Sequence, residues 1–133
     1  REVYEFYRQH LSPLEEAGLI RLPIPPQGCE INYHIFYILL RDETTRNATM
    51  AHLKRNGISA VFHYVPLHTS PMGLKLNYRE GDLPVTEDLS GRLLRIPVFP
   101  ELSTADQRRV VNCLREFLDL RSETQLAGGR QLR

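Results

Sequence analysis

Apolar residues recur along this chain at two spacings, one typical of helices and the other of strands. A first helix is predicted from six apolar residues that repeat every three or four positions: Val3, Tyr4, Phe6, Tyr7, Leu11 and Leu14. Three prolines between residues 23 and 26, followed by Gly28, exclude regular structure and indicate a connector. Residues 32–40, NYHIFYILL, are rich in β-branched and aromatic residues, which favours a strand buried largely on both faces.

The next segment predicts a helix between two strands. Asp42 can cap a helix that ends at Asn56 and Gly57, because glycine readily adopts the left-handed conformation that closes a helix. Residues 58–64 return to a strand pattern. Strand, helix and strand form a compact α/β unit, and the pattern leaves open whether the two strands are parallel neighbours.

The second half of the chain combines a long loop with short elements and one clear helix. Residues 68–84 predict a loop, whose length favours a functional role. A short helix over 85–93 and a short strand over 94–98 follow. Ser103 can cap the last helix, whose apolar stripe consists of Val110, Val111, Leu114, Phe117 and Leu118. Beyond Arg121 the pattern ends, and we expect a frayed tail.

These elements predict an α/β fold in three parts. We expect a helix and connector over 1–31, an α/β small domain over 32–120 and a disordered tail over 121–133. The helical pattern is already under way at Arg1, which indicates a piece of a longer protein. Because apolar residues are spread widely around the first helix, we also expect part of its surface to stay exposed and to favour self-association.

Composition and charge narrow the class of protein. A chain of 133 residues with 41% hydrophobic and 25% charged residues fits one globular domain. The net charge is +1 and no basic run could follow a phosphate backbone, so nucleic acid is not an expected partner. The apolar run 35–40 is too short to cross a bilayer and no signal peptide is recognisable, so we expect a cytoplasmic protein. Cys29 and Cys113 are expected to be separate thiols.

The segment FHYVPLH, residues 62–68, places polar chemistry at the end of a predicted strand. Alternation along a strand puts His63 on the face opposite Tyr64, and a proline intervenes between His63 and His68. That spacing is not a zinc pattern, so a metal site is not expected. Two interpretations stay open: the histidines are bound by backbone carbonyls at a strand end, or they line a polar ligand cleft.

Three sequence blocks carry a resemblance to a known family: NYHIFYILLRD, LKRNGISAVFHYVPLHTSPMG and LPVTEDLSGRLLRIPVFPELS. In this order, and followed by a terminal helix, they resemble the C-terminal small domain of the DegT/DnrJ/EryC1/StrS sugar-nucleotide aminotransferases. FHYVPLHTSPMG is most similar to the dTDP-4-amino-4,6-dideoxygalactose transaminases that serve bacterial surface polysaccharides such as lipopolysaccharide or enterobacterial common antigen. The resemblance covers about residues 1–118.

This resemblance implies the small domain of a fold-type-I transferase that depends on pyridoxal 5′-phosphate (PLP), with a short sheet packed against helices. The parent enzyme would be a homodimer that transfers the amino group of glutamate to a dTDP-4-keto-6-deoxyhexose. Its PLP-binding lysine and phosphate cradle would belong to an N-terminal large domain outside this chain. We therefore expect this chain alone to bind no cofactor, to contain no catalytic residue and to be inactive.

The resemblance also implies which residues approach the dTDP-sugar substrate. His63, Tyr64 and His68 would lie at the mouth of the active site, where they can donate hydrogen bonds to sugar hydroxyls or a pyrophosphate oxygen. Lys75 would reach a phosphate from the loop, which with residues 77–78 would help to close over the nucleotide-sugar.

Two other classes of function remain open from the sequence. One is a free-standing nucleotide-sugar-binding or assembly module. The other is a piece of a family member that became a dehydratase or a regulator. Lys54 is expected on a solvated helix face, and Arg92 and Arg95, which flank the last predicted strand, are expected to be surface or domain-interface charges.

Overall fold

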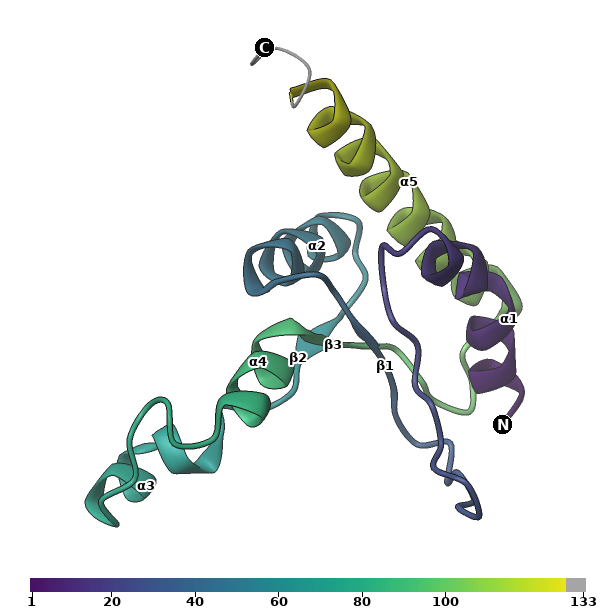
Figure 1. The fold of residues 1–133 in the computed structure, drawn as a ribbon. Helices are drawn as coiled ribbons and strands as arrows, with labels where there is room; N and C mark the ends of the chain where they lie inside the picture. Colours follow the sequence, from purple (N-terminus) through teal and green to yellow (C-terminus); the bar gives the residue numbers. More distant parts are fainter. Residues whose placement is uncertain (129–133) are drawn as a thin grey trace.

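A three-stranded antiparallel sheet organises the described part of the chain, residues 1–128 of this computed structural model (Figure 1). The central strand β3 (Leu93–Ile96) lies between β1 (Phe36–Leu39) and β2 (Val61–Phe62). Ile38 pairs with Leu94 at the centre of the β1–β3 ladder. The predicted α/β class is confirmed, and the strands on either side of β3 both run antiparallel to it.

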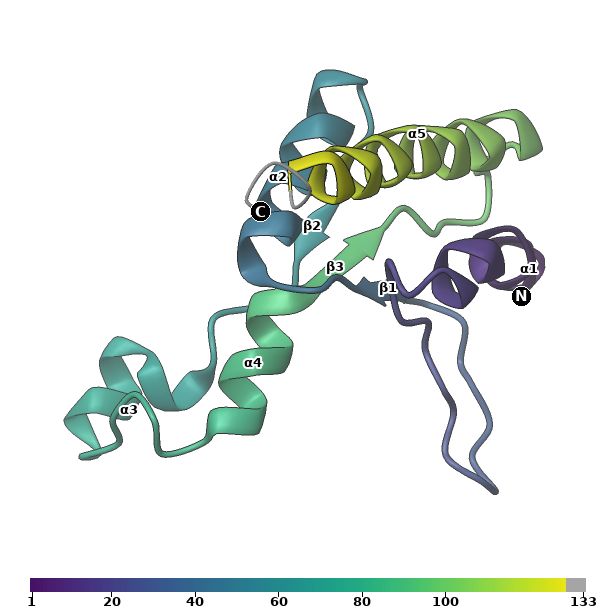
Figure 2. The same cartoon turned by 45° about the horizontal axis from the view of Figure 1, so that its top comes forward.

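Three helices enclose the core beside this sheet. They are α1 (Glu2–Glu16), α2 (Glu43–Arg55) and α5 (Thr104–Gly128). Figure 2 shows α2 and α5 on the same side of the sheet, with α1 next to the first half of α5. Nineteen buried apolar residues form one cluster that draws on all of these elements, and its largest fully buried side chains include Tyr7, Leu11, Phe36, Ile38, Leu40, Leu53, Leu94 and Leu114.

The helix caps lie where local sequence signals place them. The Asp42 carboxylate accepts the N–H of Thr45 at 2.6 Å and begins α2. Gly57 closes that helix with φ +71°, in the left-handed region that a Cβ disfavours. At the start of α5, Ser103 Oγ accepts the N–H of Asp106 at 3.1 Å.

The strands β1 and β2 are shorter than the sequence predicts, because the first residues of both predicted segments form turns. Tyr33 has φ 57°, and the chain enters the sheet only at Phe36 instead of residue 32. After α2, the N–H of Ile58 bonds to the Leu53 carbonyl and completes the helix end, so the predicted strand 58–64 is reduced to two residues. β3 covers 93–96 rather than 94–98.

The last helix is longer than predicted. α5 continues through Gly128, so the tail expected beyond Arg121 is wrong for residues 121–128. Strong helix formers such as Glu, Gln, Leu and Ala continue the helix there without an apolar stripe. Residues 129–133 of the predicted tail lie outside the described part of the chain.

Residues 63–92 form an arm that leaves the sheet at β2 and returns at β3 (Figures 1 and 2). It contains the 3₁₀ turn η1 (Leu67–Thr69), α3 (Pro71–Lys75) and α4 (Pro84–Arg92). The loop predicted over 68–84 is therefore wrong for α3, since Ser70 Oγ accepts the N–H of Gly73 and Pro71 occupies the first helical turn.

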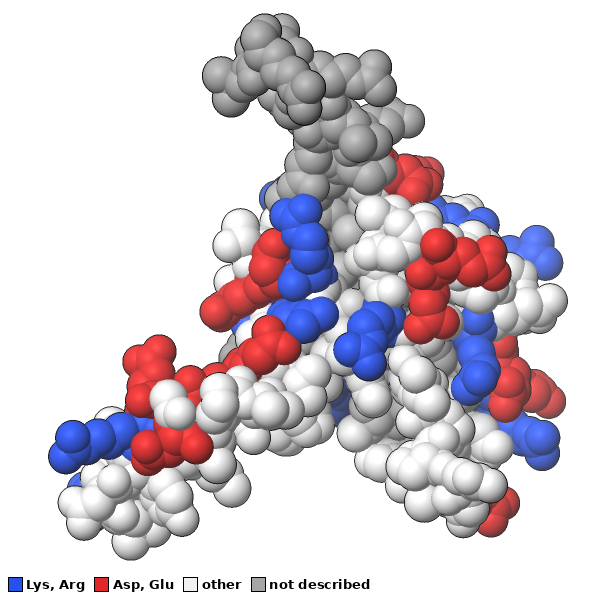
Figure 3. All heavy atoms as spheres, in the orientation of Figure 1, with Lys and Arg blue, Asp and Glu red and all other residues white. Residues whose placement is uncertain are grey.

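Exposed apolar surface gathers on this arm rather than on α1. Tyr4 and Tyr7 are 3% and 0% exposed because their rings pack on Phe36, with centroids 4.7 and 5.3 Å away, so the patch expected on the first helix is wrong. Ten exposed large apolar side chains belong to the arm: Tyr64, Val65, Leu67, Met72, Leu74, Leu76, Tyr78, Leu83, Val85 and Leu89. In Figure 3, uncharged residues cover the outer, lower end of the arm and acidic residues gather on its upper side.

Candidate functional site

Two of the predicted substrate-side residues meet at the inner end of the arm, directly after β2. The His63 ring is half-buried, and Tyr64 is 74% exposed. The two rings contact edge to face, with centroids 5.1 Å apart. A polar ring pair at this place is free to donate hydrogen bonds to a ligand that approaches the arm.

His68 is placed differently, because its side chain points into the arm. It is 5% exposed, and its Nε2 lies 2.7 Å from Glu87 Oε1. Glu87 also accepts the N–H of Gly81 at 2.9 Å. The hydrogen bond with His68, and then the one from the Gly81 N–H, lower the pKa of the Glu87 carboxyl. His68 therefore ties η1 to α4.

Lys75 lies at the outer end of the arm, in the last turn of α3 (Figure 1). Its side chain is exposed, as are Asn77 and Tyr78. Asn77 adopts φ 67° and turns the chain after α3. The structure thus separates Lys75 from the His63–Tyr64 pair, and the four predicted site residues do not converge on one point of this domain.

Of the two arginines that flank the last strand, Arg92 has a clear structural role. Its Nε donates to the Leu40 carbonyl at 2.8 Å and its Nη1 donates to Asp88 at 2.8 Å, so it holds the end of α4 against the end of β1. Arg95 lies within β3 and is half-buried.

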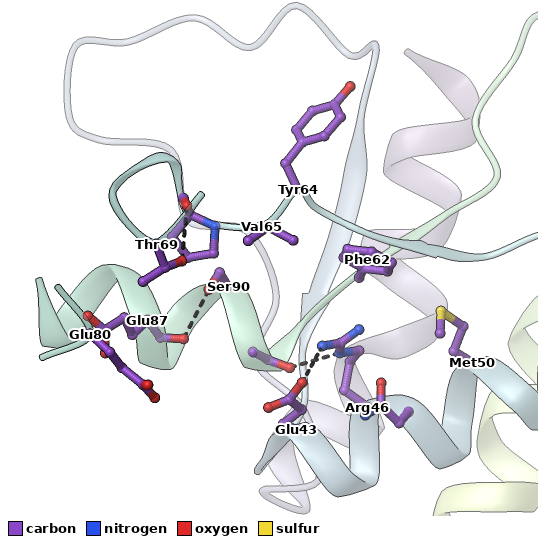
Figure 4. A pocket seen from close by; sticks show the side chains of 13 residues that line it. Glu43, Arg46, Met50, Phe62, Tyr64, Val65, Thr69, Glu80, Glu87 and Ser90 are labelled. Atoms are coloured by element: carbon purple, nitrogen blue, oxygen red, sulfur yellow. Dashed lines mark hydrogen bonds and ion pairs between the residues drawn. The ribbon is translucent and has the colours of Figure 1, made fainter. Parts of the chain in front are cut away.

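A cleft of about 570 Å³ lies between α2 and the arm, where α4 and residues 64–69 line it (Figure 4). We call it the α2–arm cleft. Its lining combines carboxylates, apolar side chains and small polar groups, among them Glu43, Arg46, Phe62, Val65, Glu87 and Ser90.

Arg46 is the residue that sequence reasoning missed. Its side chain is only 7% exposed, which is unusual for arginine. Nε donates to the Gly91 carbonyl at 2.8 Å, Nη2 donates to Glu43 at 3.1 Å, and the guanidinium lies 5.1 Å from the Phe62 ring centroid. Arg46 thereby joins α2, the end of α4 and β2. The sequence carries no signal for this, because Gly91 is 45 residues away.

The described residues do not fit PLP as a covalent cofactor. Lys54 and Lys75 are both exposed and lie in the last turns of α2 and α3. The C-terminal end of a helix carries partial negative charge, which disfavours a phosphate there. Among the residues whose side chains the structure describes, no group of three or more metal-ligating side chains comes together. No helix of the described part of the chain is long and apolar enough to cross a bilayer.

Comparison with known proteins identifies the family. Residues 1–115 match the DegT/DnrJ/EryC1/StrS aminotransferase family. The chain belongs to this family. It is 36% identical over 105 residues to a pleiotropic regulatory protein of Geobacillus stearothermophilus, which covers 78% of this chain and 28% of that protein. It is 32% identical over 121 residues to a dTDP-3-amino-3,4,6-trideoxy-alpha-D-glucose transaminase of Micromonospora megalomicea subsp. nigra, covering 89% of this chain and 31% of that enzyme.

Solved structures share the fold of this chain. The aminotransferase TlmJ from Streptoalloteichus hindustanus superposes with a TM-score of 0.78 at 29% identity, over 92% of this chain and 31% of TlmJ. NtdA from Bacillus subtilis, solved with the cofactor PMP, superposes with a TM-score of 0.72 at 23% identity, over 88% of this chain and 27% of that chain. The chain spans about 30% of the length of the relatives that it matches.

Proposed function

We propose that this chain is the small domain of a PLP-dependent sugar aminotransferase, which transfers an amino group from glutamate to a dTDP-linked keto-6-deoxyhexose. The observation that carries the proposal is the family match over residues 1–115. A family transaminase and an aminotransferase of known structure are similar to almost the whole chain. The lysine that binds PLP would belong to the large domain, since neither lysine here has a suitable environment.

The apolar arm supports a large domain as the main partner of this chain. Ten large apolar side chains are exposed between residues 64 and 89, on a segment that projects from the sheet. A monomeric protein rarely exposes so much contiguous apolar surface, so a covering surface is expected. In the assembled homodimer, the arm would pack on the large domain and carry His63 and Tyr64 to the sugar.

The four predicted site residues then divide into two roles. His63 and Tyr64 would donate hydrogen bonds to the substrate, and Lys75, at the outer end of the arm, would approach a phosphate. His68 would act indirectly, because its ring nitrogen is already bound to Glu87.

The position of the transferred amino group separates two substrates. The FHYVPLHTSPMG block resembles enzymes that aminate carbon 4, whereas the named Micromonospora relative makes a 3-amino sugar. We propose the dTDP-4-keto-6-deoxyhexose, which yields dTDP-4-amino-4,6-dideoxygalactose. The full-length protein encoded by the same gene should be assayed with glutamate and either the 4-keto or the 3-keto dTDP-sugar, and faster turnover of the 3-keto compound would reverse the assignment.

Absorbance spectroscopy with PLP tests the division of labour between the domains. We expect no stoichiometric adduct with the isolated chain, and borohydride treatment should trap no more PLP on it than on a Lys54→Arg, Lys75→Arg double variant. The full-length protein should bind PLP and respond to glutamate. A stoichiometric adduct on the isolated chain that glutamate converts would show that it holds its own active site.

A regulatory role is the second candidate, and the name of the Geobacillus relative favours it. A family member that lost its PLP-binding lysine could retain this small domain unchanged. A full-length protein that binds no PLP under the same conditions would support the regulator and contradict the transaminase.

A further inference from the structure

The arm is held in place by very little apolar burial. Of the nineteen buried apolar residues that the structure describes, none lies between residues 63 and 92, and neither does any of the half-buried residues that pack on this core. A segment with few buried apolar contacts opens at a lower cost in free energy than the core that carries it. The arm should therefore open more easily than the sheet.

The one buried side chain of the arm is polar. Within residues 63–92, all of which the structure describes, only His68 has a buried side chain, and its Nε2 lies 2.7 Å from Glu87 Oε1. Gly73 lies so close to the backbone carbonyl of His68 that a Cβ would collide with it, so α3 packs directly on η1. These two elements therefore form one body around His68.

The hydrogen bond between His68 and Glu87 joins the two halves of the arm. In the part of the chain that the structure describes, no other hydrogen bond connects residues 63–78, which lead out from the sheet, with residues 79–92, which return to it. The Glu87 carboxylate also accepts the N–H of Gly81 at 2.9 Å, so it holds the turn before α4 as well. Because these two hydrogen bonds, that with His68 first, lower the pKa of the Glu87 carboxyl below its usual 4.5, the group is ionised at pH 7.

The root of the arm is fixed independently of this bond. Arg46 Nε donates to the Gly91 carbonyl at 2.8 Å, and Arg92 Nε donates to the Leu40 carbonyl at 2.8 Å. Where the arm leaves the sheet, β2 pairs with β3. Opening of the arm can therefore stop at its root and leave the sheet intact.

We propose that the bond between His68 and Glu87 is a latch, whose release opens residues 63–90 as one unit while the sheet stays folded. The latched arm presents its ten exposed large apolar side chains in one fixed arrangement, and the open arm does not. The latch consists only of residues of this chain, so the inference goes beyond the proposed function and does not rest on it.

Amide hydrogen exchange of the chain at pH 7, followed by NMR, tests the latch. Glu87→Ala removes the carboxylate without weakening α4 itself, since alanine is the strongest helix former. Amides of α3 and α4 should then exchange faster by the same factor, about tenfold, because the closed arm alone loses a hydrogen bond to a charged group. Amides of β1 and β3 should keep their rates. Glu80→Ala, which removes an exposed carboxylate from the turn before α4, is the matched control and should change none of them.

A conservative variant separates the hydrogen bond from other effects of the substitution. Glu87→Gln keeps an oxygen acceptor for His68 and for the Gly81 N–H but carries no charge. Its amides in α3 and α4 should therefore exchange at rates between those of the wild type and those of Glu87→Ala.

Several outcomes would overturn the proposal. Unchanged exchange of α3 in Glu87→Ala would show that the two halves of the arm open separately. Equal acceleration in β1 and β3 would show that the whole domain unfolds instead, and equal acceleration by Glu80→Ala would reduce the effect to one of general charge. Wild-type amides of the arm that already exchange as fast as those of an unfolded chain would show that no latch holds it. Failure of the proposed transaminase would show in the PLP and turnover assays, which do not enter this experiment.

Discussion

Replacing Arg46 by methionine tests whether the buried guanidinium holds the arm to the core. Methionine keeps most of the side-chain length and apolar contact, but it removes all donors. Three interactions are lost: the hydrogen bond to the Gly91 carbonyl, the ion pair with Glu43 and the contact with the Phe62 ring.

The hydrogen bond to Gly91 dominates the expected loss. A hydrogen bond from a charged group contributes about 1.5–3 kcal/mol to the free energy of unfolding. The Glu43 side chain is 65% exposed, so that ion pair adds only about 0.3–0.5 kcal/mol. The cation–π contact adds about 0.5–1 kcal/mol. Because methionine escapes the desolvation cost of a buried charge, part of this loss is regained, and we expect a net destabilisation of about 2 kcal/mol.

Urea unfolding followed by far-ultraviolet circular dichroism measures the effect. For a domain of this size, 2 kcal/mol lowers the urea midpoint by roughly 1 M. Tyrosine fluorescence is the second probe, since the chain has no tryptophan. Arg55→Met, at an exposed position of the same helix, is the control and should change stability by less than about 0.5 kcal/mol. Equal midpoints for Arg46→Met and Arg55→Met would refute the reasoning.

Three further changes test other parts of the molecule. Gly73→Ala should unfold α3 because the new Cβ would collide with two backbone carbonyls of η1. Limited proteolysis should then cut the arm of the variant faster than that of the wild type, and equal cutting rates would contradict the predicted collision. Phe36→Ala removes a fully buried ring and should cost about 3–5 kcal/mol in urea unfolding, and a loss below 1 kcal/mol would disagree with the packing. The hydrogen bond from the Thr45 N–H lowers the pKa of the Asp42 carboxyl from 3.8 to about 2. The ionised carboxylate therefore stabilises the folded state fully above pH 3.8, and this stabilisation is lost as the pH falls toward 2. Asp42→Asn keeps the cap without the titration, and its urea midpoint should therefore fall less than that of the wild type between pH 5 and pH 2.

Features that depend on neighbouring residues could be predicted from the sequence. Asp42, Gly57 and Ser103 act within three or four positions of the chain, and each forms the predicted cap. Ser70 and Pro71 carry the same kind of signal for α3, which was overlooked among the prolines and glycines of a loop-like segment.

The candidate site depended instead on contacts between distant residues. Arg46 meets Gly91 across 45 positions, and His68 meets Glu87 across 19. No periodicity relates such pairs, since their contacts follow from how α4 packs against α2 in the first case and against η1 in the second. For the same reason, His68 could be predicted as a substrate-side residue, but the sequence could not show that its ring nitrogen is already hydrogen-bonded to a carboxylate.

The arm and α1 show how burial decides the meaning of an apolar pattern. Around α1 the apolar residues are more than one helix face holds, yet Tyr4 and Tyr7 both contact the Phe36 ring and are buried within the chain. The arm has no such cover among the described residues, and its apolar side chains follow neither a strand nor a helix period along its whole length. Such irregular spacing is expected where a segment is shaped to fit a surface formed by other residues, because its own secondary structure then need not segregate polar from apolar faces. The uncovered arm is therefore the surface that the large domain of our proposal would cover, and the chain spans 28–31% of the length of the relatives that it matches.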